Sequence, residues 1–212
     1  MELLEQISAS LQSGEDERVA ALTRDALAAG LAPERILADG LLAGMAEVGQ
    51  RFGAHEIFLP DVLLAARAMQ AGIELLRPRL AQTGMPTLGR VVLGTVQGDI
   101  HDIGKNLVGI MLRGAGFEVI DLGCDVSAER FVEQAVAHDA TVIGMSALLT
   151  TTMPAMKRVI DLLHSEGLAG RIRTIIGGAP VSQKFADQVG ADAYGYDAAN
   201  AVEKVSVLVA GP

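Results

Sequence analysis

The sequence predicts an α/β chain in which a four-helix bundle precedes a doubly wound parallel sheet of five strands. Up to about residue 80, apolar residues recur at three- and four-residue spacing, which is typical of amphipathic helices. From Arg90 onward, short strand-like runs alternate with helical segments, the pattern of a parallel sheet with right-handed crossovers. Half of the residues are apolar, the aromatic fraction is 3% and there is no Trp. Small aliphatic side chains must therefore build a core of packed helices and covered strands.

The N-terminal part contains four helical segments. Gly30 is predicted as the residue that ends the second helix, while Pro33 and Pro60 open the third and fourth. The segments are 2–14, 16–30, 33–53 and 60–80. Residues 81–89 contain Gly, Pro and Thr without periodicity and are the predicted linker and hinge. We therefore expect a helical domain at 1–84 and an α/β domain at 90–212.

The second part contains five strand-like runs, at 90–96, 117–123, 140–146, 171–178 and 191–196. Helical segments are expected around 105–115, 127–138, 152–166 and 180–188, with a last one from 197. This unit resembles a flavodoxin-like doubly wound fold. In such folds ligands bind at the carboxyl ends of the strands, near the point where the strand order reverses.

Composition also restricts the function classes. The net charge of −9 disfavours a nucleic-acid surface, which needs clustered Lys and Arg. Cys124 is the only cysteine, so no internal disulfide is possible and the usage fits a reducing compartment. The first residues include acids rather than a basic signal region, and charges interrupt the apolar stretches well before ~18 residues. We expect a soluble, cytoplasmic protein without a nucleic-acid or membrane partner.

The loop after the first strand reads GDIHDIG, from Gly98 to Gly104. A phosphate-binding Walker loop has four residues between its glycines and then Lys-Ser or Lys-Thr, whereas this loop has five and then Lys105-Asn106. The G-x-G-x-x-G loop of dinucleotide-binding folds is absent. A metal hydrolase needs several converging ligands, and no second histidine is evident beside His101. Two interpretations of His101 remain open: a structural role, and a role as the single protein ligand of a metal.

The single-ligand interpretation depends on neighbours of His101. Asp99, two residues earlier, could accept a hydrogen bond from one ring nitrogen and leave the other free to coordinate. Ser146, at the end of the third strand, could hydrogen-bond Asp99. One imidazole backed by a carboxylate suits a metal whose remaining positions are filled by a macrocycle.

The order Asp99-x-His101-x-x-Gly104, then Ser146-x-Leu148, then Gly177-Gly178 resembles the D-x-H-x-x-G, S-x-L and G-G signature of cobalamin-binding domains. Those domains bind the cofactor base-off and His-on. The stretch GMAEVGQRFGAHEIFLPDVLLAARAM, at 44–69, resembles the cap bundle of methionine synthase and of small corrinoid proteins of methyltransferase systems. His55 and Cys124 depart from residues that are commoner in the family.

The resemblance implies a cobalamin cofactor, as methylcobalamin or cob(I)alamin, with His101 as the lower axial ligand of cobalt. Asp99 and Ser146 would complete a relay to the imidazole, and Gly104, Gly177 and Gly178 would leave room for the cofactor's tail. The residues expected to bind the cofactor are Asp99, Ile100, His101, Ile103, Gly104, Ser146, Leu148, Thr150, Thr151, Gly177 and Gly178, with Phe52, Leu59 and Val62 covering the methyl-bearing face.

The resemblance further implies a methyl carrier rather than a complete enzyme. The expected partners are a substrate-specific methyltransferase, a methylcorrinoid:acceptor methyltransferase that serves tetrahydrofolate or a thiol, and a reductive activase. A cobalamin-dependent sensor is the alternative, although no basic helix-turn-helix is evident. A subunit of an adenosylcobalamin mutase is a further alternative, but such subunits generally lack the helical cap. The methyl donor is not readable from the sequence.

Overall fold

The structure of the protein is a computed structural model that describes residues 2–83 and 88–210. The chain folds as two compact units, a helical unit and an α/β unit. Residues 84–87 of the predicted linker and hinge lie outside the described residues, so the domain boundaries at 1–84 and 90–212 stay a prediction. Among the described residues, none of the helices has both the length and the apolar character that a membrane span requires.

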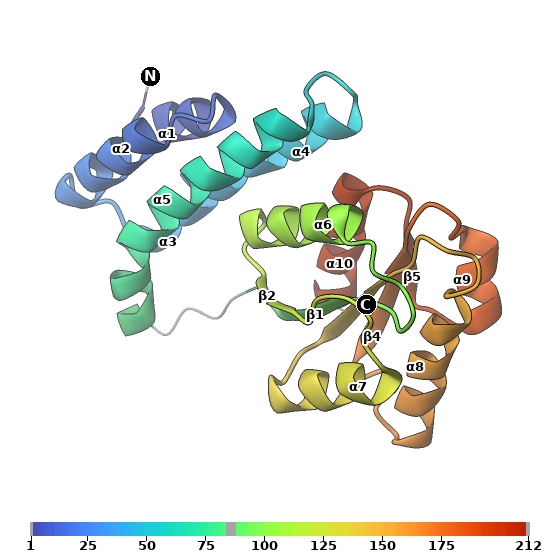
Figure 1. Cartoon of the computed structure of the whole chain (residues 1–212). Coiled ribbons are helices and arrows are strands. Elements are labelled where there is room, and N and C mark those ends of the chain that lie inside the picture. Colours follow the sequence, from blue (N-terminus) through green and yellow to red (C-terminus); the bar gives the residue numbers. More distant parts are fainter. Residues whose placement is uncertain (1, 84–87, 211–212) are drawn as a thin grey trace. The chain divides into compact units, whose positions relative to one another are not determined.

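The helical unit begins with α1 and α2, whose ends follow local sequence signals (Figure 1). A capping box between Glu2 and Glu5 opens α1. Gly30, with a φ of 82°, follows the C-cap residue Ala29 of α2, which confirms the prediction that it ends this helix. The remaining helices of the unit follow as α3, the π-helix η1, α4 and α5. Their bounds are α1 Leu3–Gln12, α2 Asp16–Ala28, α3 Pro33–Arg35, η1 Ile36–Leu42, α4 Ala43–Gly53 and α5 Leu59–Thr83.

The third predicted helix is continuous from Pro33 to Gly53 but contains a π-helical segment, η1, which the sequence pattern did not reveal. Most side chains that face the inside of the bundle are aliphatic or Met and come from every long helix, with Ser10 and Thr23 as buried polar residues. The fully or nearly fully buried ones include Ile7, Leu11, Val19, Ile36, Leu41, Val48, Val62, Met69 and Leu76. The unit is thus held by the small aliphatic core that the composition predicts.

The α/β unit has a five-stranded sheet in the order β2-β1-β3-β4-β5, and all neighbouring pairs are parallel. This order confirms the predicted doubly wound fold, with its reversal between β1 and β3. The strands are β1 Arg90–Thr95, β2 Glu118–Asp121, β3 Val142–Ser146, β4 Arg173–Gly177 and β5 Ala193–Gly195. Each lies within one of the predicted strand runs.

Helices cover both faces of the sheet (Figure 1). α6 and α10 lie on one face, and α7, α8 and α9 lie on the other. The core beneath the second group contains Phe131 of α7, Ile160 of α8 and Ile176 of β4. The bounds are α6 Ile103–Gly114, α7 Ala128–Ala137, α8 Pro154–Ser165, α9 Gln183–Val189 and α10 Ala198–Ala210. Because all strands run the same way, their carboxyl ends gather at one edge of the sheet.

Candidate functional site

The loop that follows β1 lies at this carboxyl edge and brings Asp99 and His101 together. The His101 Nδ1 atom is 2.8 Å from Asp99 Oδ1, and the His101 backbone N–H donates to the same oxygen at 3.1 Å. The Asp99 side chain has no exposed surface, whereas 46% of the His101 side chain is exposed. The predicted pairing of the two residues is present, with the carboxylate buried and the imidazole facing outward.

The second carboxylate oxygen of Asp99 accepts three hydrogen bonds from the segment after β3. The backbone N–H groups of Leu148 and Leu149 donate at 2.8 and 3.1 Å, and Thr152 Oγ1 donates at 2.8 Å. Burial acts to raise the pKa of Asp99, but the hydrogen bonds from His101, Leu148 and Thr152 prevail and hold its pKa well below the ordinary value. Asp99 is therefore an anion that only accepts hydrogen bonds.

The anionic state of Asp99 fixes the tautomer of the neutral His101 ring. Since the carboxylate offers no proton, Nδ1 of His101 must be the donor across the 2.8 Å contact. The lone pair of a neutral imidazole then resides on Nε2, which is the atom available to a ligand or a metal. The site presents one oriented nitrogen donor.

The predicted hydrogen bond from Ser146 to Asp99 is wrong, because the hydroxyl that donates to Asp99 belongs to Thr152. Ser146 is the last residue of β3, and its carbonyl accepts from Val96 N at 3.0 Å in the sheet. Thr152 lies in the turn before α8, where its hydroxyl is also 2.8 Å from the Leu149 carbonyl. The sequence shows three consecutive threonines at 150–152, and no pattern distinguishes the buried one.

Exposed apolar side chains lie in the two segments that meet at Asp99. Ile100 and Ile103 are each 77% exposed, and Leu148 and Leu149 are also exposed. Thr150 and Thr151, predicted to line the site, are exposed in the same turn as Leu149. An exposed apolar cluster around one polar donor suits a large, flat, mainly apolar ligand.

The three predicted glycines have different roles in the structure. A Cβ atom at Gly104 would meet no heavy atom within 4 Å, so this position opens to free space. A Cβ at Gly177 would lie 2.9 Å from the Gly195 carbonyl oxygen. Gly178 has a φ of 122°, and a Cβ there would overlap the Ala147 carbonyl oxygen at 1.9 Å. The protein's own backbone therefore requires glycine at 177 and 178, and their contact with a cofactor tail stays a prediction.

The three residues predicted from the helical unit differ in exposure. Phe52 of α4 is partly buried, Leu59 of α5 is 36% exposed and Val62 is fully buried in the bundle. Leu63 and Leu64 on the same helix are exposed, as is Phe58 just before it. The placement of the three predicted residues over a cofactor stays a prediction. The buried Val62 has no exposed surface with which to touch a cofactor directly.

The remaining residues noted near the loop have ordinary local partners. Asp102 immediately precedes α6, and its carbonyl accepts from Asn106 N at 2.7 Å, so it lies at the helix N-terminus. Cys124 is partly buried, with its Sγ 3.6 Å from the Ile100 carbonyl. In the part of the chain that the structure describes, no three His, Cys, Asp or Glu side chains gather to hold a metal ion. The metal-hydrolase alternative thus lacks a ligand set there.

A doubly wound sheet that presents one oriented imidazole amid apolar side chains at its carboxyl edge defines a cofactor-binding α/β domain. Its single nitrogen donor fits a corrinoid, whose ring supplies four nitrogen ligands to cobalt, so that one protein nitrogen would complete the set on one face and the other face would stay open. A family model described as a B12 binding domain matches residues 89–205, and a second model of the same description matches residues 3–77. The chain belongs to this B12-binding family.

Known corrinoid proteins match nearly the whole chain. A trimethylamine corrinoid protein of Methanosarcina mazei is 44% identical over 210 residues, which cover 98% of this chain and 97% of the relative. A dimethylamine corrinoid protein of Methanosarcina acetivorans is also 44% identical, covering 99% and 97%. The methanol:cobalamin methyltransferase complex MtaBC of Methanosarcina barkeri matches with a TM-score of 0.88 at 36% identity, covering 99% of this chain and 80% of that chain.

These findings confirm the resemblance to corrinoid proteins of methyltransferase systems and the predicted cobalamin cofactor. A cobalamin-binding protein of Desulfitobacterium hafniense matches in structure as well, with a TM-score of 0.81 at 30% identity. It covers 98% of this chain and 99% of that chain. The individual cofactor-binding residues and the axial role of His101 stay predictions.

Proposed function

We propose that the protein carries a methyl group on the cobalt of a bound corrinoid, with His101 as the lower axial ligand in a base-off, His-on state. The observation that supports this most directly is the exposed imidazole, whose Nδ1 is held 2.8 Å from the buried, anionic Asp99. When bound, the corrinoid supplies a cobalt centre that accepts and releases a methyl group. The chain's own residues hold, orient and shield that centre.

Each residue of the site has a role under this proposal. Asp99 fixes Nε2 of His101 as the donor atom, and the N–H groups of Leu148 and Leu149 with Thr152 keep the carboxylate in place. The exposed Ile100 and Ile103 are close to His101 in the sequence and would exclude water from the side of the cofactor that faces this loop. Preorganisation of this kind lowers the cost of binding because the ligand atom needs no reorientation.

We further propose that the methyl donor is a methylamine, delivered by a methylamine:corrinoid methyltransferase. The trimethylamine and dimethylamine corrinoid proteins, at 44% identity over nearly the whole chain, support this donor. A methylcorrinoid:acceptor methyltransferase would remove the methyl group, and a reductive activase would restore the reduced cobalt. The relatives' names also favour a carrier over the sensor alternative.

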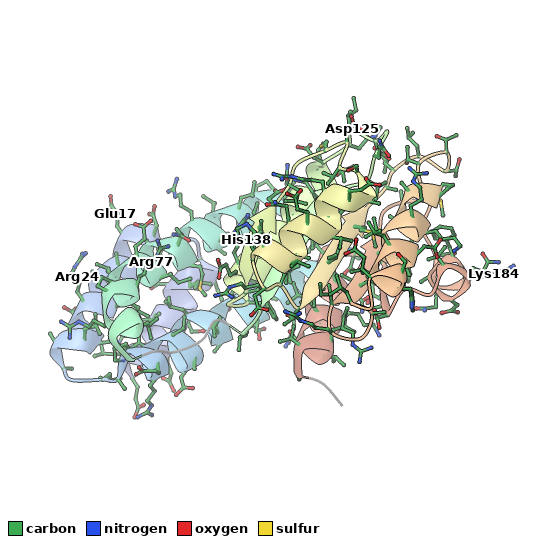
Figure 2. The ribbon with its side chains drawn as sticks, turned by 90° about the horizontal axis from the view of Figure 1, so that it is seen from below. Glu17, Arg24, Arg77, Asp125, His138 and Lys184 are labelled. Atoms are coloured by element: carbon green, nitrogen blue, oxygen red, sulfur yellow. The ribbon has the colours of Figure 1, made fainter. Side chains whose placement is uncertain are left out.

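The axial assignment is tested with the visible spectrum of the cobalamin-loaded chain. His101→Ala should shift the spectrum to that of a base-off corrinoid without a protein ligand, because the donor nitrogen is removed. His138→Ala is the matched control, since His138 lies just after α7 and is exposed (Figure 2). An unchanged spectrum for the His101 variant would show that another group binds the cobalt.

The methyl donor is tested separately. The reduced, cobalamin-loaded chain is added to purified methyltransferases with trimethylamine, dimethylamine, monomethylamine or methanol. Formation of methylcobalamin on the chain with a methylamine, and its absence with methanol, is the expected result. Methylation by the methanol system alone would contradict the methylamine assignment and leave the axial assignment intact.

A further inference from the structure

Residues 121–126, which begin at the last residue of β2, run beside the His101 loop and are bonded to that loop and to the end of β1. Thr95 N donates to the Gly123 carbonyl at 2.9 Å, and Val126 N donates to the Thr95 carbonyl at 3.0 Å. Val96 and Val126 form an isolated parallel bridge beyond the named strands. Two neighbouring strands thus continue their pairing into the loops that follow them, and the path of one loop restricts the path of the other.

Asp125 makes two bonds to the His101 loop, one through its backbone and one through its side chain. Its N–H donates to the Asp99 carbonyl at 3.0 Å, and its Oδ1 accepts from Gly98 N at 2.7 Å. Asp125 has a φ of 55°, a left-handed conformation that is uncommon outside glycine, and Gly98 also has a positive φ, of 86°. Asp125 therefore fixes the backbone on both sides of the peptide that leads into Asp99.

The other end of the loop is anchored to the same residues by an ion pair whose lysine is buried and whose aspartate is partly exposed. Lys105, in the first turn of α6, is only 3% exposed, and its Nζ lies 2.5 Å from Asp121 Oδ1. The same oxygen accepts from Gly123 N at 2.9 Å. Residues 98–105, which contain the imidazole, are thus held at both ends by carboxylates of residues 121–126.

A second aspartate of the α/β unit, Asp139, also has a positive φ but binds a different partner. Asp139 has a φ of 49°, and its Oδ1 accepts from Arg171 at 3.1 Å, with both side chains largely exposed. It follows α7, whereas Asp125 precedes that helix (Figure 2 labels Asp125 and His138, just before and just after α7). The carboxylate of Asp139 holds only a surface arginine, while that of Asp125 holds the backbone of the site.

We propose that Asp125, supported by the Lys105–Asp121 pair, is a positioning residue for the axial ligand. Its carboxylate sets the path of the chain from Gly98 to His101 and so fixes how far the imidazole reaches from the sheet edge. The proposal rests on the proposed function, in which His101 is that ligand.

The test uses the full chain labelled uniformly with ¹⁵N, loaded with unlabelled cobalamin and reduced to Co(II). The axial nitrogen then splits the electron paramagnetic resonance signal into a doublet if it comes from the protein and into a triplet if it comes from the cofactor's own base. Asp125→Gly removes the carboxylate while tolerating the positive φ, Asp125→Asn keeps an oxygen that accepts from Gly98 N, and Asp139→Gly is the matched control.

The wild type, Asp125→Asn and Asp139→Gly should give the doublet. Asp125→Gly should lose most of it and bind cobalamin about 10-fold more weakly, the scale on which groups that orient metal ligands act. A doublet and an affinity unchanged in Asp125→Gly, or equal losses in Asp139→Gly, would overturn this proposal alone. A triplet in the wild type would overturn the axial assignment and this proposal with it.

Discussion

The amino and carboxyl edges of the α/β sheet, where the parallel strands begin and end, carry different kinds of interaction. At the amino edge, exposed ion pairs join neighbouring elements, between Arg90 and Glu118, Arg171 and Asp139, and Arg173 and Asp192. At the carboxyl edge, the hydrogen bonds converge on the buried carboxylate of Asp99, and isoleucines and leucines face outward. At the amino edge the charged side chains pair with one another. At the carboxyl edge the carboxylate orients the His101 ring, whose Nε2 is left for a ligand.

One motif appears at both edges and shows what differs. Thr152 Oγ1 donates to the carboxylate of Asp99, and Thr174 Oγ1 contacts the carboxylate of Asp192 at 3.0 Å, with both threonines buried. At the amino edge the carboxylate also pairs with Arg173, but at the carboxyl edge its ring partner is His101. Both edges have the buried threonine, so the difference lies in the other side chain that the carboxylate binds, Arg173 at the amino edge and His101 at the carboxyl edge.

The largest expected effect follows from the backbone crowding at the carboxyl edge. Gly178→Ala should lower the free energy of unfolding by more than about 3 kcal/mol, because the new Cβ overlaps the Ala147 carbonyl oxygen and the φ is positive. Gly190→Ala, at a φ of 78° with open space around it, should cost only about 1 kcal/mol. Urea unfolding of both variants measures the difference, and equal losses would show that the Ala147 contact relaxes freely.

A smaller effect is expected for the Lys105–Asp121 ion pair of the carboxyl edge, in which the lysine is buried and the aspartate is partly exposed. Asp121→Asn should cost about 2 kcal/mol at neutral pH, because Lys105 remains buried without its counter-charge. Arg90→Met, which removes an exposed pair of the amino edge, should change the free energy of unfolding by about 0.5 kcal/mol or less.

The Asp121 variant also has a pH signature. Burial acts to raise the pKa of Asp121, but the hydrogen bonds from Lys105 and Gly123 and the charge of Lys105 prevail and lower its pKa. A carboxylate with a lowered folded pKa adds stability above its unfolded pKa of about 4, and this is lost as the pH falls through the folded value. Urea unfolding should show the gap between wild type and Asp121→Asn closing below about pH 4. A gap independent of pH would contradict the ion pair's role.

The matched threonines give the finest comparison of the edges. Thr152→Val and Thr174→Val should each cost about 1–2 kcal/mol, because each leaves a carboxylate with one hydrogen bond fewer. Only Thr152→Val should also alter the visible spectrum of the cobalamin-loaded chain, and Thr152→Ser should restore it. Spectral changes of equal size in both variants would remove the distinction between the edges.

Much of the fold could be predicted because it depends on local patterns. The five strands fall within the predicted runs, and Gly30 ends its helix as expected, since periodicity and turn residues act over a few positions. The π-helical segment η1 was missed because its residues, Ile36–Leu42, keep apolar spacing that an α-helix would also accept. Backbone hydrogen-bond pattern, rather than composition, distinguishes the two.

The site was predictable only where residues are close in sequence. Asp99 and His101 are two residues apart, so their pairing could be expected from the loop alone. The choice of Thr152 over Ser146 could not, because it depends on which hydroxyl a turn 50 residues away presents to Asp99. The role of Asp125 is also invisible in the sequence, since it arises from the pairing of two loops across the sheet.

The π-helical segment has a consequence for how the helical unit tolerates changes in length. Each residue of an α-helix turns the chain by about 100°, and a π turn holds one residue more than an α turn. Deleting one residue within Ile36–Leu42 would convert the π turn into an α turn, and α4 beyond it would keep its angular position relative to α3. The partly buried Phe52 near the end of α4 would then keep its place, whereas a deletion within α4 before Phe52 would turn it by about 100°. The π segment is thus the one part of this helix that can lose a residue without changing which way the later residues face.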